Sequence, residues 1–287
     1  MNRLLVLDLS FLIHRAHFGH GFDMRSPKGT PTKAIYGALQ WFFTFYHEYR
    51  PTHIIVALDS STKSLERTKL YPEYKAGRNS SMSEEDAIGI KKQKKITAEL
   101  LAKLTKPECC IKVAGWEADD VMASAAYSFK DDTQVCLAAS DKDLNQVLFD
   151  NVLIYNPVKQ EYTSAKSMSV RYGFPYDKFV FFQSLLGDSS DNIKGVVGVG
   201  EKTATALVQQ FASDSEMFNS LDSVQSTKIR AKLQEQKGEF ELSKKLVTLN
   251  TSLLDGRTLD DFRVERLRTK EILAYLMVLG IKKLQTY

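Results

Sequence analysis

The chain has 287 residues, 43% of them hydrophobic, which is enough to bury the core of one large domain or two. Its 39 lysines and arginines outnumber 35 aspartates and glutamates, and because nine of those acids recur in one pattern, the remaining surface is clearly basic and suits a polyanionic partner. Three cysteines without a C-x-x-C pair, no leader-like start and no long apolar stretch argue against a disulfide scaffold, a zinc site, secretion and a membrane span, so a cytoplasmic protein is expected.

Short apolar runs alternate with helix-like segments through the first half of the chain. Strands are expected at residues 4–7, 54–58 and 135–140, because apolar runs of this length are typical of parallel strands buried on both faces. This order predicts β-α-β units, and hence an α/β fold with a mostly parallel central sheet flanked by helices. The helices are expected at residues 32–48, 84–104, 117–129 and 176–186.

A carboxylate follows each of these apolar runs. Asp8, Asp59 and Asp141 stand where the three strands are expected to end. In an open parallel sheet the carboxyl ends of the strands lie along one edge, so these acids should reach the same crevice. Carboxylates that lie close together repel one another unless cations bind between them. The pattern therefore predicts a divalent-metal site, and the number of acids suggests two ions.

Residues 67–95 form a basic segment that contains few core-forming residues in its first part. Long segments of this kind are usually functional or disordered, and this one is expected to be an exposed excursion that leads into a helix. Tyr74, Lys75 and Arg78 combine an aromatic ring with positive charges, which can stack on unpaired bases and hold phosphates. Arg15, shortly after the first apolar run, is a further candidate for a phosphate contact. The lysines at 91, 92, 94 and 95 are more simply explained as a solvated helix face.

More acids open an expected helix and follow the third expected strand. Glu117, Asp119 and Asp120 stand at the start of a helix, where the helix dipole explains one or two acids but not three. Asp143 joins Asp141 in an Asp-Lys-Asp turn, and alternate residues of an extended turn point the same way, so both could reach one ion. Each group taken alone is also a common structural cap, and both interpretations stay open at this point.

Asp188 and Asp191 follow the apolar helix that is expected to end at residue 186. Acids are unfavourable at a helix C-terminus unless a cation compensates them, so Asp188 is more informative than an ordinary polar helix end. The glycine-spaced segment 195–203 comes next and precedes another helix. Its glycines would let backbone N–H groups approach phosphates, which favours a helix–hairpin–helix contact with a DNA backbone over a plain glycine turn. The candidate contact residues are Gly195, Gly198, Gly200, Lys202 and Thr203.

The second half of the chain looks helical, with helices expected at residues 201–211, 227–246 and 269–279. A soft boundary near Pro175 divides the chain into two regions. Residues 1–174 would form the α/β region, which includes the basic segment, and residues 175–287 the helical region, which includes the hairpin. The two regions are expected to share one core.

Together these motifs resemble the 5′-nuclease or flap endonuclease (5′-3′ exonuclease) family, and above all the 5′-nuclease domain of bacterial DNA polymerase I and its free-standing phage and bacterial relatives. The likeness runs in family order from Leu4 to about Thr251. The matching segments are residues 74–78, 113–121, 140–143, 186–192, 195–205 and 242–248.

The resemblance implies a role for each candidate residue. Two groups of acids would hold two Mg²⁺ or Mn²⁺ ions, some of them through water. The first group would be Asp8, Asp59, Glu117, Asp119 and Asp120, and the second Asp141, Asp143, Asp188 and Asp191. Lys75 and Arg78 would contact the scissile phosphate, with Tyr74 stacked near it. Residues 67–95 would form a helical arch for a 5′ single strand, and the hairpin would hold the downstream duplex and could also bind a monovalent cation such as K⁺.

The implied function is structure-specific hydrolysis of DNA phosphodiester bonds by two metal ions, as a 5′-3′ exonuclease and flap endonuclease in DNA replication and repair. The substrate would be DNA with a 5′ flap or 5′ end and a downstream duplex, and the protein would act as a monomer. The alternative is a non-catalytic, structure-specific DNA-binding accessory protein, but DNA binding alone would not favour nine acids beside phosphates. A metal-dependent ribonuclease is a second rival, which the duplex-binding hairpin disfavours.

Overall fold

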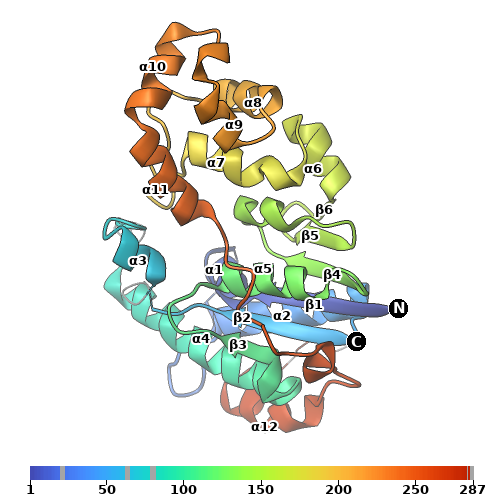
Figure 1. Cartoon of the computed structure of the whole chain (residues 1–287). Helices are drawn as coiled ribbons and strands as arrows, with labels where there is room; N and C mark the ends of the chain where they lie inside the picture. Colours follow the sequence, from blue (N-terminus) through green and yellow to red (C-terminus); the bar gives the residue numbers. More distant parts are fainter. Residues whose placement is uncertain (20–22, 62–64, 78–81, 283, 285–287) are drawn as a thin grey trace.

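The computed structural model describes residues 1–19, 23–61, 65–77, 82–282 and 284, and it centres on a six-stranded sheet (Figure 1). The strand order is β3–β2–β1–β4–β5–β6; β1 to β5 run parallel, and β6 pairs antiparallel with β5. The predicted α/β class with a mostly parallel sheet is therefore confirmed. The strands are Asn2–Asp8 (β1), His53–Leu58 (β2), Cys110–Lys112 (β3), Thr133–Ala138 (β4), Val152–Asn156 (β5) and Glu161–Thr163 (β6).

The apolar run of β1 is buried on both of its faces. Leu4 and Val6 belong to one core cluster, and Leu5 and Leu7 belong to another on the opposite side of the sheet. The chain proceeds from β1 through β2 to β3 and then crosses to β4, on the other side of β1. The carboxyl ends of β1 and β4 therefore flank the point at which ligands bind in open parallel sheets.

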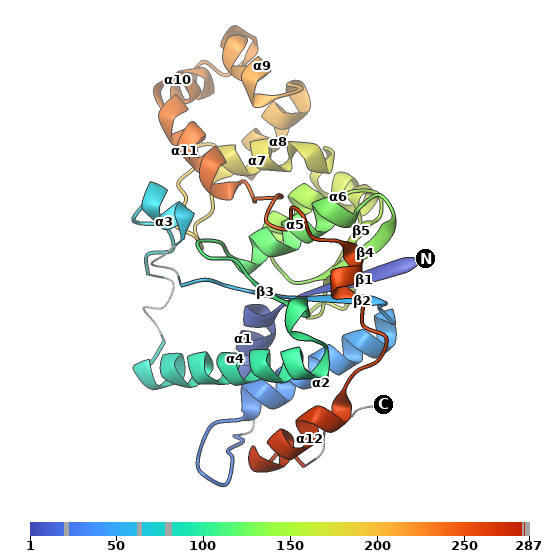
Figure 2. The same ribbon diagram turned by 60° about the horizontal axis from the view of Figure 1, so that its bottom comes forward.

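Helices cover both faces of the sheet (Figure 2). One face, lined by Leu5 and Leu7, is covered by four helices, and α5 (Ala118–Phe129) packs on the other. The four helices are α1 (Leu9–Gly19), α2 (Lys33–Tyr49), α4 (Glu84–Leu104) and α12 (Thr269–Val278). Within the described residues, none of the helices combines the length and the apolar character needed to cross a membrane.

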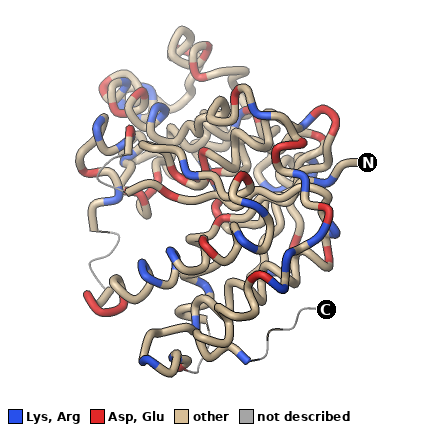
Figure 3. The backbone as a smooth tube through the Cα atoms, turned by 90° about the horizontal axis from the view of Figure 1, so that it is seen from below, with Lys and Arg blue, Asp and Glu red and all other residues tan. Residues whose placement is uncertain are grey.

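Helix α4 has the bounds that its sequence predicts. Ser83 caps its first turn by accepting a hydrogen bond from the N–H of Asp86 at 3.1 Å. Figure 3 shows acidic residues in the first turn of α4 and basic residues further along it, an order that the helix dipole favours. The basic stretch includes Lys94, which forms an ion pair with Asp59.

The remaining helices lie on the α5 side of the sheet and share its core (Figure 1). Phe182 and Phe240 from this helical region belong to the same buried cluster as Leu4 and Val6. The two predicted regions therefore share one core, and the boundary at residue 174 stays a prediction. The helices are α6 (Ala165–Tyr172), α7 (Phe179–Leu186), α8 (Glu201–Gln210), α9 (Asp214–Asn219), α10 (Thr227–Glu235) and α11 (Lys237–Val247).

Some expected helices differ from the structure. The helix predicted at 227–246 is two helices, α10 and α11, which meet at Gln236. The helix predicted at 176–186 begins as the 3₁₀ turn Tyr176–Lys178 and becomes α-helical at α7. Short elements such as α3 (Glu66–Leu70), β3 and β6 were not predicted, because three to five residues are too few to show a periodic apolar pattern.

The loop after α7 folds back on itself through two closely packed glycines. A Cβ on Gly195, which has a φ of +62°, would lie 2.5 Å from the Gly187 nitrogen and 2.6 Å from the Leu185 carbonyl oxygen. Between the glycines, Asp188 and Ile193 exchange backbone hydrogen bonds of 2.8 and 2.7 Å. Glycine is therefore required at position 195, and the fold-back fixes where Asp188 points.

We expect Gly195→Ala to lower the free energy of unfolding by about 3 kcal/mol, because a methyl group would overlap backbone atoms in a left-handed conformation. Gly238→Ala is the matched control: Gly238 lies in α11 with open space around it, so this change should stabilise the protein by about 0.5 kcal/mol. Urea unfolding measures both values. Equal effects of the two substitutions would contradict the close backbone packing of Gly195 against Gly187 and Leu185.

Candidate functional site

Acidic side chains from five segments lie along the carboxyl edge of the sheet. Asp8 is the last residue of β1, and Asp59 directly follows β2. Asp141 follows β4 and caps a short 3₁₀ helix. Residues 117–120 stand at the start of α5, and residues 188–191 lie in the loop after α7. The fold thus delivers acids that are far apart in the sequence to one edge.

Burial and neighbouring negative charges act together on Asp8 and Asp119. Burial and the charge of Asp59 raise the pKa of Asp8 to about 7. Burial and the charges of Asp141 and Asp8 raise the pKa of Asp119 well above its usual value. Asp119 Oδ1 is buried and accepts no hydrogen bond from the described residues. A buried carboxylate oxygen in this situation is unfavourable unless a cation or water meets it.

Lys94 of α4 compensates the charge of Asp59. Its Nζ lies 2.8 Å from Asp59 Oδ2 and donates to the hydroxyl of Ser10, which in turn donates to the same carboxylate. Asp59 Oδ1 accepts a hydrogen bond from the N–H of Ala118 at 2.9 Å, which ties the end of β2 to the start of α5. Burial raises the pKa of Asp59, but Lys94 and these hydrogen bonds outweigh it, and the pKa falls to about 2.

Asp188 and Asp143 lie in contrasting surroundings. Asp188 Oδ1 accepts hydrogen bonds from the N–H and the hydroxyl of Ser190 at 2.8 and 2.7 Å, and Oδ2 lies 3.0 Å from Lys142 Nζ. Burial raises the pKa of Asp188, but these partners outweigh it and hold the pKa below its usual value. Burial and the charge of Asp141 raise the pKa of Asp143 to about 7, although Gln183 donates to its Oδ1 at 2.5 Å.

Lys75 joins the start of α5 to the loop after α7. Its side chain is 8% exposed; Nζ forms an ion pair with Glu117 Oε1 and lies 3.4 Å from Asp191 Oδ2. The hydroxyl of Tyr74 donates to the same two acids, at 2.7 Å to Glu117 Oε2 and 3.1 Å to Asp191 Oδ2. Lys75 adopts a φ of +56°, and its N–H donates to the Asp191 carbonyl at 3.0 Å. The basic segment is therefore anchored on the acids at this point.

Three lysines thus lie directly on the acids, namely Lys75, Lys94 and Lys142. Among the described residues, no three acidic, histidine or cysteine side chains lie close enough together to hold a metal ion as they stand. The donors are nevertheless all carboxylate oxygens, the ligands that Mg²⁺ and Mn²⁺ prefer, and Asp119 has a buried oxygen with no donor. The residues therefore fit a divalent cation.

Several predicted roles do not fit this geometry. The ring of Tyr74 is only 4% exposed and its hydroxyl binds two acids, so it is not placed to stack on a base. The turn at 141–143 is not extended: Asp141 accepts a hydrogen bond from the N–H of Asp143 at 2.9 Å and begins a 3₁₀ helix. Asp120 is fully buried and both its oxygens bind Arg67, so it does not face the other acids as a ligand would.

The two predicted phosphate contacts outside this cluster are less defined. Arg15 is exposed on α1. Arg78 lies outside the described residues. Their proposed contacts with phosphate stay predictions.

The predicted hairpin presents an exposed turn. Gly198 has a φ of +88°, and a Cβ there would lie 1.7 Å from Lys232 Nζ, which donates to the Val197 carbonyl at 3.0 Å. The backbone at Gly200 does not require glycine, because its φ is −92° and a Cβ would meet open space at the start of α8. The backbone thus requires glycine at position 198 and not at position 200, while the predicted approach of both residues to phosphate stays a prediction. Lys202 is exposed on the first turn of α8, and Thr203 is half-buried beside it.

Sequence reasoning missed three partners of the acids. Lys94 was assigned to a solvated helix face, yet it is the one lysine of its run with an ion pair to Asp59. Lys142 stands between two acids of the Asp-Lys-Asp motif, which is a signal that could have been used. Gln183 lies inside an apolar helix, and a lone buried amide in such a helix indicates a polar partner elsewhere.

Comparisons with known proteins agree with this arrangement. Residues 3–173 match the family model of the 5′-3′ exonuclease N-terminal resolvase-like domain, and residues 174–270 match that of the 5′-3′ exonuclease C-terminal SAM fold. The chain is 31% identical over 285 residues to a 5′-3′ exonuclease of Aquifex aeolicus, and the match covers 99% of this chain and 94% of that protein.

Two further relatives illustrate the range of the likeness. DNA polymerase I of Bacillus subtilis is 30% identical over 289 residues, which cover 98% of this chain but 32% of the polymerase. The chain thus spans about a third of that relative. A bacteriophage T5 flap endonuclease, solved with DNA and metal ions, superposes with a TM-score of 0.75 at 22% identity, covering 97% of this chain and 100% of that chain. This last likeness shows a shared fold.

We expect Lys94→Ala to lower the free energy of unfolding by about 1 kcal/mol in EDTA, because Asp59 would lose its charged partner while repelling Asp8. Lys95→Ala is the control, since Lys95 is exposed on the same helix and its loss should change stability by less than about 0.5 kcal/mol. Indistinguishable urea unfolding curves for the two variants would show that Lys94 does not balance the acids.

Proposed function

This chain belongs to the 5′-3′ exonuclease family, and from that membership we propose that it is a structure-specific 5′ nuclease of DNA, acting both as a 5′-3′ exonuclease and as a flap endonuclease. The observation that carries the proposal is the gathering of acids from five segments at the carboxyl edge of the sheet, with lysines lying on them. A protein that only bound DNA would gain nothing from such acids, because they repel phosphates.

The acids would hold two divalent cations in two neighbouring groups. Bound Mg²⁺ or Mn²⁺ would supply an activated water and would offset the charge that develops on the phosphate. The bacteriophage T5 relative was solved with metal ions, which supports the assignment. We assign the first group to Asp8, Asp59, Glu117 and Asp119, and the second to Asp141, Asp143, Asp188 and Asp191.

The lysines of the cluster would have two tasks. Without a cation, their ammonium groups neutralise the carboxylates and allow the acids to lie together. Once bound cations supply that charge, Lys75 would turn from Glu117 toward the scissile phosphate, where its charge would stabilise the transition state. Its position in the basic segment, in contact with Glu117 and Asp191, supports this role. We propose the same phosphate contact for Arg78.

The hairpin at 195–203 would bind the backbone of the downstream duplex. Its turn is exposed at Gly198, and the first turn of α8 offers free N–H groups and the charge of Lys202. Lys232 adds a second positive charge beside the turn. Such contacts bind phosphates and do not depend on the base sequence, as a structure-specific enzyme requires. A monovalent cation such as K⁺ could bind carbonyl groups of the same turn.

The substrate we propose is DNA with a 5′ flap or 5′ end next to a duplex, and the 67–95 segment would contact the 5′ single strand. Removal of such 5′ segments is a step of DNA replication and repair, and we assign the protein to those processes. Its action as a monomer in the cytoplasm stays a prediction.

The direct test uses end-labelled 5′-flap, nicked and single-stranded DNA with Mg²⁺ or EDTA. We expect Mg²⁺-dependent cuts near the flap junction. Asp188→Asn should slow cleavage at least about 100-fold, because it removes a cation ligand, while flap binding stays within about tenfold. Asp131→Asn is the control, since Asp131 is exposed and 3.5 Å from Lys130, its ion-pair partner on the surface.

The same assay can contradict the proposal. Binding of flap DNA without any Mg²⁺-dependent cut would favour the non-catalytic accessory protein. Cleavage by Asp188→Asn at the rate of Asp131→Asn would remove Asp188 from the site. Preferential cleavage of RNA would favour the ribonuclease rival.

A further inference from the structure

Arg67 at the start of the basic segment is buried and uses every donor that it has. Its Nε donates to the Leu246 carbonyl at 2.7 Å. Nη1 binds Asp120 Oδ2 at 2.6 Å and Glu117 Oε2 at 3.3 Å. Nη2 binds Asp120 Oδ1 at 2.8 Å and the Thr248 carbonyl at 2.9 Å. A guanidinium group has five N–H donors, so this set of contacts leaves none over.

Both carboxylate oxygens of Asp120 are likewise fully used as hydrogen-bond acceptors. Its Oδ2 also accepts the N–H of Glu117 at 3.1 Å, and Oδ1 accepts the N–H of Asn250 at 2.9 Å. The residue has no exposed surface. Each oxygen therefore receives one charged and one backbone hydrogen bond in a closed environment. A carboxylate so occupied is a poor metal ligand, which separates Asp120 from its neighbour Asp119.

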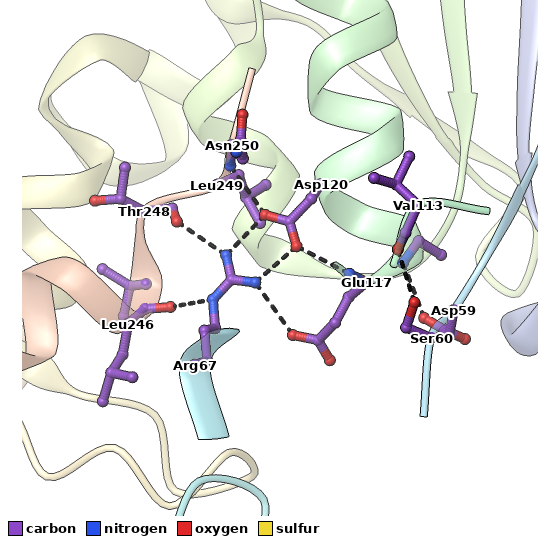
Figure 4. Close-up of polar contacts among 12 residues, drawn as sticks. Asp59, Ser60, Arg67, Val113, Glu117, Asp120, Leu246, Thr248, Leu249 and Asn250 are labelled. Atoms are coloured by element: carbon purple, nitrogen blue, oxygen red, sulfur yellow. Dashed lines mark hydrogen bonds and ion pairs between the residues drawn. The ribbon is translucent and has the colours of Figure 1, made fainter. Parts of the chain in front are cut away.

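The contacts of this pair join three elements that are distant in the sequence (Figure 4). Arg67 belongs to α3, Asp120 to α5, and Leu246 and Thr248 to the end of α11 and the residue that follows it. Figure 4 shows the guanidinium between the α5 acids on one side and the two carbonyl groups on the other. One side chain thus holds the sheet, the basic segment and the helical region together.

Both substrate-handling parts of the molecule depend on these elements. The segment that begins at Arg67 leads, within eight residues, to Lys75 on Glu117. Helix α11 braces the duplex hairpin, because Ser243 accepts the N–H of Gly195 at 3.1 Å and Gln236, at the start of α11, accepts that of Val197 at 2.8 Å. The pair therefore lies where the position of the hairpin is set relative to the acids.

We propose that Arg67 and Asp120 are positioning residues, which hold the duplex hairpin in register with the acid cluster, and that Asp120 is not a metal ligand. This inference rests on the proposed function. A duplex held by the hairpin presents its phosphate to the acids only if the distance between the two sites is fixed. A short single strand does not use the hairpin, so its cleavage does not need that register.

The test compares single-turnover cleavage of 5′-flap DNA and of a short single strand, at saturating enzyme and Mg²⁺. Asp120→Asn keeps the volume of Asp120, and Arg67→Lys keeps the charge of Arg67 but supplies three donors in place of five. Each should slow flap cleavage about 100-fold and single-strand cleavage less than about tenfold, because misplacement by about an ångström costs that much in rate. Arg67→Lys should not preserve the rate of flap cleavage, because lysine cannot donate hydrogen bonds to Asp120 and to both carbonyl groups at once.

Ser124→Ala is the matched control at the same junction. The Ser124 hydroxyl shares its proton between the backbone carbonyls of Asp120 at 2.8 Å and Asn250 at 2.9 Å, and it accepts the N–H of Leu253 at 3.1 Å. It contacts neither Arg67 nor the side chains of the acid cluster. Loss of this hydroxyl weakens the packing of the same chain segment on α5 but leaves the hairpin in register with the acids. The ratio of the flap-cleavage rate to the single-strand cleavage rate should therefore stay within about twofold of its wild-type value.

Mn²⁺ binding, followed by calorimetry without DNA, separates positioning from ligation. Asp120→Asn should bind the same number of Mn²⁺ ions as the wild type with affinities within about threefold, whereas Asp119→Asn should lose binding. Loss of a bound ion in Asp120→Asn would overturn the inference, as would equal slowing of both DNA substrates. If Arg67→Lys does not fold, Asp120→Asn decides alone. A wild type that cuts neither substrate would refute the proposed function, while Mn²⁺ binding would still test Asp120.

Discussion

Electrostatic repulsion among the acids at the carboxyl edge of the sheet is the constraint on which the other features depend. The parallel sheet delivers Asp8 and Asp59 side by side, and burial raises the pKa of Asp8 to about 7. Positive charge beside these acids offsets their mutual repulsion and so stabilises the fold. The structure supplies three ammonium groups, Lys75 and Lys94 from the two ends of the basic segment and Lys142 from the turn after β4. Each ammonium group neutralises nearby carboxylates, as a bound divalent cation would in the function we propose.

The placement of these counter-ions links charge balance to the substrate-handling segments. Lys75 lies near the start of the basic segment, and Lys94 lies on α4, close to its end. Both ends of that segment are therefore attached to the acids that would hold cations. In the function we propose, Lys75 would exchange its contact with Glu117 for one with the scissile phosphate once a bound cation supplies positive charge near the acids. The Arg67–Asp120 pair is different, because its donors and acceptors are saturated and it would stay fixed during that exchange.

The sequence predicted the features that follow from local pattern. Apolar runs that end in Asp8 and Asp59 predicted the sheet edge, and the helix expected at residues 84–104 has the bounds of α4. It could not predict pairings across long sequence separations. A local capping box with Glu117 marks Asp120, but the sequence does not show that Arg67, more than fifty residues away, binds Asp120 and not Asp119. The sequence places Lys94 with its neighbours on a solvated helix face, and only the packing of α4 against α1 and α2 brings it to Asp59.

The central claim is that the acids form a divalent-cation site whose charge lysines balance until the cation binds. Thermal unfolding of the wild type across a Mg²⁺ titration, compared with NaCl at equal ionic strength, tests it most directly. Only the folded chain gathers the acids, so Mg²⁺ should raise the Tm in a saturable way, by an amount that corresponds to about 2.7 kcal/mol at a hundred times the Kd. NaCl should have little effect. An identical rise in both salts, or none in Mg²⁺, would contradict the claim.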